Sequence, residues 1–169
     1  VIAGNNNVAI GRGAALNATD MADSVFIGRL AGGLGVITGG SNTLVGYAAG
    51  YDLTSGDSNV MVGRNSGANT TTGKQNILIG LDACGAGVLA NASSTQGMYN
   101  VVVGPGAGYD LTSGEANILL GKDAGANLTS SSNNIAIGHG ALDYIDTCSH
   151  CVAIGTSALA VQNADVKNT

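Results

Sequence analysis

The residues best suited to chemistry lie near the end of the chain, in the segment Cys148-Ser-His-Cys151. Two thiols three residues apart, with an imidazole beside them, are typical of zinc sites and of redox centres. A structural zinc site needs four ligands, and this segment supplies three at most, without a second Cys pair to complete the set. A thioredoxin-like centre needs a βαβ pattern around the motif, and the surrounding sequence lacks one.

Several uses remain open for Cys148 and Cys151. A disulfide between neighbouring chains would lock the end of a fibre in an oxidising, extracellular setting. The two thiols are equally suited to staying free or to pairing locally, and a metal shared by His150 around a symmetry axis is a further option. The third cysteine, Cys84, stands where other parts of the chain have Gly, so we expect a small buried side chain.

The sequence does not predict an enzyme. The two histidines, His139 and His150, have no orienting acid at a fixed spacing. Six Lys and Arg against eleven Asp and Glu give a net charge of −5, without the clustered basic face that nucleic acid requires. No apolar run approaches the length of a membrane span. We therefore expect no catalytic residue, no cofactor, no metal, no nucleic-acid partner and no membrane insertion.

A short phrase repeated along nearly the whole chain indicates which elements position these residues. Asn59-Val-Met-Val-Gly63 returns 17 residues later as Asn76-Ile-Leu-Ile-Gly80. The phrase occurs nine times, starts with Asn in seven of them, and recurs every 17 or 18 residues except for one interval of 24. The glycines that end the phrases, here called the repeat glycines, are Gly11, Gly28, Gly46, Gly63, Gly80, Gly104, Gly121, Gly138 and Gly155.

This period predicts an all-β fold, a parallel β-solenoid or β-roll of about nine 17-residue coils over residues 1–160. The three apolar residues of each phrase form a short strand. The Gly makes a turn that a Cβ would block, and the Asn side chains bond along the stack. The composition, with 28 Gly, one Phe and no Trp, suits a core of small and aliphatic side chains. Residues 161–169 lose the pattern and are expected to cap the solenoid or link it to a following segment.

The alternation of side chains along each strand predicts how separate chains associate. Consecutive side chains point to opposite faces, and here both faces are apolar, so one fills the coil and the other needs a cover. Because no other element is available as that cover, we expect an intertwined homotrimer with the middle strand residues at the seam between chains. The predicted trimer seam consists of Phe26, Leu44, Met61, Leu78, Val102 and Leu119.

The 24-residue interval carries an insertion around residues 81–99, which is expected to leave the stack as a lateral loop. Solenoids often carry recognition in such loops, so a receptor loop is one interpretation. A tolerated insertion without a partner is the other. The candidate receptor contacts are Asn91, Ser93, Gln96 and Tyr99.

A basic strip directly follows the repeat glycines, and stacking would align it along one edge of the sheet. Three roles are open for the strip: contact with an anionic polysaccharide, cross-chain pairing with acids such as Asp57, Glu115 or Asp123, and edge protection against aggregation. The basic strip consists of Arg12, Arg29, Arg64, Lys122 and His139.

The phrases Asn7-Val-Ala-Ile-Gly11-Arg-Gly-Ala14 and Asn134-Ile-Ala-Ile-Gly138-His-Gly-Ala141 resemble the head repeats of trimeric autotransporter adhesins and the related repeats of bacteriophage tail fibres. The resemblance covers nearly all of residues 5–160. It implies a left-handed parallel β-roll, three chains wound about one axis, and a role in holding on to a cell surface. The coil is longer than is typical of the adhesin heads, which favours a phage fibre.

On this resemblance, we expect a structural segment of a phage tail fibre, a trimeric shaft in the virion with a role in host attachment. Its partners would be further copies of itself, other fibre or virion proteins, and a cell-surface glycan or protein. The alternative is an autotransporter adhesin head on the bacterial surface that binds host matrix or cells. A distant alternative is a left-handed β-helix acyltransferase, but that fold needs three aliphatic hexapeptides per coil, and this period supplies one.

Overall fold

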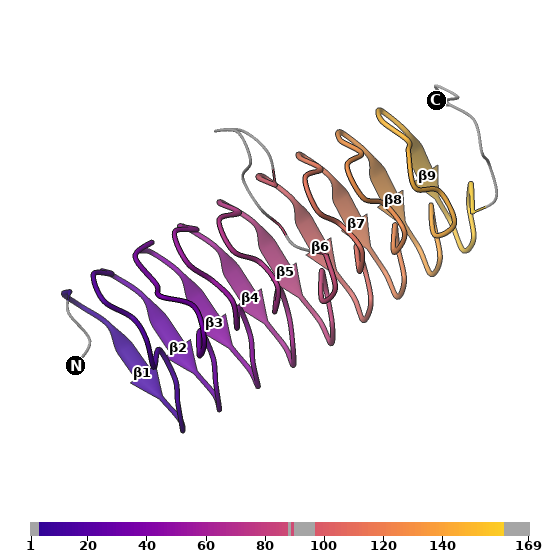
Figure 1. The fold of residues 1–169 in the computed structure, drawn as a ribbon. Coiled ribbons are helices and arrows are strands. Elements are labelled where there is room, and N and C mark those ends of the chain that lie inside the picture. Colours follow the sequence, from indigo (N-terminus) through magenta and orange to yellow (C-terminus); the bar gives the residue numbers. More distant parts are fainter. Residues whose placement is uncertain (1–3, 88, 90–96, 161–169) are drawn as a thin grey trace.

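The computed structural model describes residues 4–87, 89 and 97–160. This part of the chain contains nine three-residue strands and no helix, which confirms the predicted all-β solenoid with coils of about 17 residues. Figure 1 shows one strand per coil, in chain order along the body. The strands are β1 (Val8–Ile10), β2 (Val25–Ile27), β3 (Thr43–Val45), β4 (Val60–Val62), β5 (Ile77–Ile79), β6 (Val101–Val103), β7 (Ile118–Leu120), β8 (Ile135–Ile137) and β9 (Val152–Ile154).

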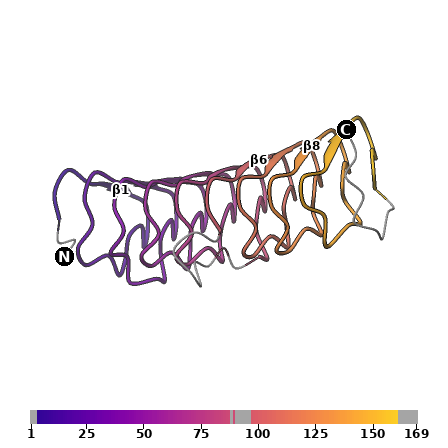
Figure 2. The ribbon, with the colours of Figure 1, turned by 90° about the horizontal axis from the view of Figure 1, so that it is seen from above.

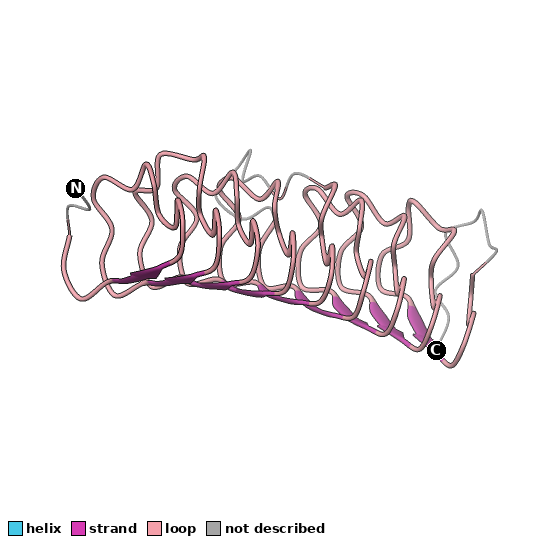
Figure 3. Cartoon of the chain, turned by 90° about the horizontal axis from the view of Figure 1, so that it is seen from below, coloured by secondary structure: helices cyan, strands magenta, loops and turns pink. Residues whose placement is uncertain are grey.

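The described strands lie in one parallel sheet, in the order β1 to β9. Equivalent positions of neighbouring repeats pair with each other, so that Met61 of β4 lies between Leu44 of β3 and Leu78 of β5. The same register holds across the 24-residue interval, where Leu78 pairs with Val102. Figures 2 and 3 show the stack from above and from below, with the strands along one side and the turns and loops on the others.

The repeat glycines end each strand because the chain turns there at a close approach between coils. Gly63 has a φ of +133°, and a Cβ on it would lie 2.4 Å from the carbonyl oxygen of Gly80 in the next coil. That contact is far too short for a side-chain carbon, and the atom opposite is backbone, which cannot swing away. A repeat glycine is therefore needed both for its backbone angle and for the spacing of the coils.

The core consists of a column of one strand side chain per coil. The middle residues of β2 to β7 point into the coil and are 0% exposed in a single chain. They share one hydrophobic cluster with a second column from the return part of the coils, which includes Leu53, Leu111 and Leu128. The buried middle residues are Phe26, Leu44, Met61, Leu78, Val102 and Leu119.

The middle residues therefore do not form the predicted trimer seam, because each chain covers them itself. The reason is the narrow interior of the coil. A small residue such as Ala49 follows three positions after each repeat glycine and is buried in every coil but the first and the last, and the column beyond it supplies a single side chain such as Leu53. This leaves room for one large strand side chain per coil. In a three-residue strand the middle residue points to one face and its two neighbours to the other, so those neighbours face outward.

The asparagine stack is present as predicted and ties each coil to itself and to its neighbour. Nδ2 of Asn59 donates to Oδ1 of Asn42 at 3.1 Å and to the carbonyl oxygen of Gly73, across its own coil, at 2.8 Å. The backbone N–H of Asn59 donates to the same Oδ1 at 3.0 Å. The side chains are fully buried, so these bonds replace water for groups that would otherwise have no partner.

Replacing Asn76 by Ala should lower the free energy of unfolding by roughly 2–4 kcal/mol, because it leaves several buried polar groups without a partner. The amide of Asn76 bonds to Asn59, to Gly97 and, through Oδ1, to the backbone and side chain of Asn100. Urea denaturation measures the loss. The control is Gln75→Ala, an adjacent exposed residue, which should cost less than about 0.5 kcal/mol. Equal losses for the two variants would contradict the structural role of the ladder.

Candidate functional site

The outward residues of the strands form an apolar surface, here called the strand face. The first and third residue of each strand point outward, and each of them is Val, Ile or Leu except Thr43. Ile79, in the middle of the stack, is 37% exposed, and Ile154, at its end, is 67% exposed. No charged residue lies within β1–β9. A continuous aliphatic surface of this kind is typical of an association site.

Charged residues line both edges of the strand face. The trailing edge is the column directly after the repeat glycines and carries the basic strip, whose five members are all exposed. The leading edge comprises the two residues before the asparagine position and carries three acids together with Lys74 and His150. Opposite charges stand at the two ends of the same strand in three cases: Asp23 and Arg29 around β2, Asp57 and Arg64 around β4, and Glu115 and Lys122 around β7.

Some of these charges already have partners in their own chain. Lys74 Nζ lies 2.6 Å from Asp57 on the leading edge. Beyond the trailing edge, Asp123 pairs with Lys122, and its carboxylate lies 3.8 Å from Nε2 of His139. All of these side chains are substantially exposed, so the pairs contribute little to stability and can accept a further partner.

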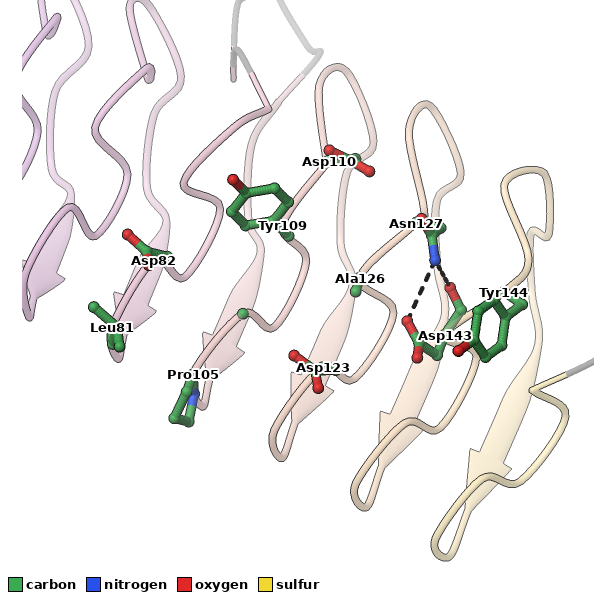
Figure 4. A pocket seen from close by; sticks show the side chains of 11 residues that line it. Leu81, Asp82, Pro105, Tyr109, Asp110, Asp123, Ala126, Asn127, Asp143 and Tyr144 are labelled. Atoms are coloured by element: carbon green, nitrogen blue, oxygen red, sulfur yellow. Dashed lines mark hydrogen bonds between the residues drawn. The ribbon is translucent and has the colours of Figure 1, made fainter.

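Two hollows on the side of the solenoid that follows the trailing edge form what we call the tyrosine groove. The larger has a volume of about 490 Å³ and is lined by Tyr109, Ala126 and Tyr144 among others. Figure 4 shows its two tyrosines on either side of Ala126. The smaller, of about 320 Å³, is lined by Tyr51 and Ala68 among others. Both hollows are therefore built from aromatic and small residues of adjacent coils.

The larger hollow is rich in oxygen acceptors. Its lining includes the carboxyl groups of Asp82, Asp110, Asp123 and Asp143, and Nδ2 of Asn127 donates to the carbonyl and the carboxylate of Asp143 (Figure 4). Burial raises the pKa of the Asp143 carboxyl and the charge of Asp123 raises it further, whereas His139 and Lys122 lower it. In the part of the chain that the structure describes, no group of three or more His, Cys, Asp or Glu is placed to hold a metal ion.

Of the uses that the sequence leaves open for Cys148 and Cys151, the structure shows the local pair. Cys148 and Cys151 form a disulfide with each other within one chain, so the interchain disulfide is wrong. Their Cα atoms are 6.2 Å apart, and both side chains are buried in the last coil. Cys151 also extends the asparagine ladder, because its N–H donates to Oδ1 of Asn134 at 2.9 Å. Cys84 is buried as expected, and burial raises the pKa of its thiol to about 12.

The candidate receptor contacts are only partly covered by the structure. Asn91, Ser93 and Gln96 lie outside the described residues. Tyr99 is 54% exposed and lies on the leading edge next to β6, separated from the tyrosine groove by the strand face. Among the described residues, no helix has the length and hydropathy needed to cross a membrane.

Thiol chemistry tests the disulfide between Cys148 and Cys151 and the buried, free thiol of Cys84. Nonreducing electrophoresis of the denatured protein should give a single-chain band, because the disulfide closes within the chain. In the native protein at mildly alkaline pH, Cys84 should resist a thiol reagent, since its thiol is inaccessible and protonated, and it should react fully after unfolding. Disulfide-linked multimers, or rapid labelling of native Cys84, would contradict this assignment.

Comparison with known proteins assigns no family to this chain. The strand face and the tyrosine groove are therefore the two surfaces from which its function has to be argued. No protein-family description, curated protein or solved structure matches this chain.

Proposed function

We propose that this chain is a structural fibre segment in which parallel copies pack together through the strand face. The observation that carries the proposal is the strand face, whose outward side chains are half-buried on β3, β4 and β6 and include an exposed aliphatic residue on each of the other strands. Water contact along such a surface is unfavourable by about 25 cal/mol per Å², and packing against another copy removes it. A trimer is the arrangement that we favour, since three equivalent strand faces can close around one axis without an open edge.

A stack of coils joined by backbone bonds suits a shaft. Each described coil donates and accepts along the long axis through its strand, its asparagine and its turns, as at Val60 with Asn76 and at Gly63 with Val45. At the usual strand spacing, nine coils span roughly 43 Å. We propose a phage tail fibre as the setting, on the likeness of the repeated phrase, with an autotransporter adhesin head as the alternative. Both require association outside a cell and differ in what the segment is attached to.

The two charged edges favour a parallel arrangement. Rotation of a copy about the long axis brings the trailing edge of one chain to the leading edge of the next at the same coil. At β2, β4 and β7 this juxtaposes a base with an acid, as with Arg64 of one chain and Asp57 of another copy. An antiparallel pair with facing sheets brings like edges together, so it lacks this complementarity.

Native mass by light scattering tests the role of the strand face. The wild-type protein should have the mass of three chains, and the double variant Ile79→Lys with Ile137→Lys should have the mass of one, since a charge cannot be buried in an apolar interface. The controls are Leu16→Lys and Leu34→Lys, which are 65% and 55% exposed and lie outside the strand face. Both should keep the wild-type mass. A wild-type protein that is a stable monomer would refute the proposed assembly.

Charge reversal tests the direction of packing. Changing Arg29, Arg64 and Lys122 to Glu should raise the dissociation constant about tenfold at low salt, as three weak pairs become three repulsions. Adding Asp23→Lys, Asp57→Lys and Glu115→Lys in the same chain exchanges the two edges and should restore the assembly. An oligomer that is indifferent to these changes would keep the fibre proposal and exclude the parallel, charge-matched arrangement.

A further inference from the structure

A six-residue segment occurs twice in the chain and is only partly explained by the fold. Tyr51-Asp-Leu-Thr-Ser-Gly56 returns as Tyr109-Asp-Leu-Thr-Ser-Gly114. The Leu of each copy lies in the core, the Thr hydroxyl donates to a carbonyl of the next coil, and the Gly carbonyl accepts from a ladder asparagine. Core packing accounts for the Leu, and these hydrogen bonds account for the Thr and the Gly. They give no reason for the Tyr and the Asp at the start of each copy.

Both tyrosines stand at the same place in the coil, next to a hollow. Tyr51 and Tyr109 each follow a repeat glycine by five residues, and the same position in the next coil is Ala68 and Ala126, respectively. The small alanine leaves a space beside the larger ring, and both spaces are among the hollows of the tyrosine groove. The duplicated segment thus places a tyrosine beside a small alanine twice, three coils apart, or roughly 14 Å at the usual strand spacing. Asp110 also lines the larger hollow, whereas the lining of the smaller one contains no carboxyl group.

We propose that the tyrosine groove binds an uncharged oligosaccharide that lies along the long axis of the solenoid. The exposed faces of tyrosine rings pack against the apolar faces of sugar rings, and Tyr109 is 42% exposed beside its hollow. Carboxylates accept hydrogen bonds from several hydroxyl groups at once, which Asp110 and Asp143 are placed to do. This adds a binding site to the fibre segment and does not depend on how its copies assemble.

The charges of the groove select against other ligands. Four carboxyl groups in the larger hollow repel an acidic polysaccharide, so the basic strip at the rim does not make this an anion site. Among the described residues, these carboxylates do not form a cluster that could hold a metal ion, so the hollow is not a cation site. The ligand with the matching chemistry is rich in hydroxyl donors and carries no negative charge.

A peptide fits the groove less well, because the backbone along its floor is already paired. The N–H groups of Ala68 and Ala126 donate within their own turns, to Asn65 and Asp123. Their carbonyl oxygens accept from the N–H groups of Asp52 and Asp110. An extended peptide binds a sheet edge through unpaired backbone N–H and C=O groups, and these alanines offer none.

Calorimetric titration of the full chain with cellohexaose, N-acetylated chitohexaose and hexagalacturonate tests the inference. At least one of the two neutral hexasaccharides should bind, and hexagalacturonate should not. Tyr51→Ala and Tyr109→Ala should each weaken binding about tenfold, the usual loss of an aromatic anchor. Tyr109→Phe should retain most of the affinity because it keeps the ring. Tyr99→Ala, an exposed tyrosine outside the groove, is the matched control and should change nothing.

The outcomes separate this inference from the fibre proposal. Absence of binding by both neutral hexasaccharides overturns it, as does tighter binding of hexagalacturonate. Loss of binding in Tyr99→Ala but not in the groove variants also overturns it and moves recognition to the insertion. The groove variants should keep the native mass of the wild-type protein, so a change in assembly cannot account for a change in affinity.

Discussion

Each coil of this protein has to repeat the path of the coil before it, because three kinds of contact join equivalent positions. The strands pair in register, the buried asparagines share one oxygen with two donors of the next coil, and the repeat glycines approach the following turn too closely for a side chain. A Cβ at Gly46, for example, would lie 2.3 Å from the carbonyl oxygen of Gly63. A few columns are therefore restricted in residue type. The others are free to vary, as the trailing edge does from Arg12 to Pro105.

The restricted columns are what made the fold predictable. Period, strands, glycine turns and asparagine stack all follow from the phrase that contains Asn59 and Gly63. The direction in which Met61 points did not follow from alternation alone, because a strand with two apolar faces is consistent with either orientation. The signal that decides it is also in the sequence: the small residue at Ser66 and the single inward position that is Thr70 in this coil and Leu53 in the one before leave space for one strand side chain per coil. Coil volume and alternation together place Met61 inside the coil.

The site-level expectations depended on contacts that a repeat pattern does not contain. Nothing in the spacing of Cys148 and Cys151 separates a bridge within the chain from one between chains, and the folded turn brings them together. The groove was missed because tyrosines five residues after a repeat glycine occur only at Tyr51 and Tyr109, too rarely to register as a column. The sequence contains the repeated Tyr-Asp pair, but the hollow beside each tyrosine exists because the next coil has an alanine there, and only the fold brings the two together. The columns that are free to vary hold the residues that could define a binding site, and a residue that occurs once or twice in such a column forms no repeat pattern.

The 24-residue interval leaves both ladders intact, with Nδ2 of Asn100 bonded to Oδ1 of Asn76 at 3.1 Å and Val103 paired with Ile79. The stack thus accepts extra sequence at that turn without a change in the positions that its neighbours require. In evolutionary terms, the length of that turn and the residues of the restricted columns can change independently. A longer turn, or a second copy of a segment such as Tyr51–Gly56, changes the exposed surface and leaves the contacts between coils as they are. Selection on the exposed turns can therefore act without altering the residues that hold the coils together.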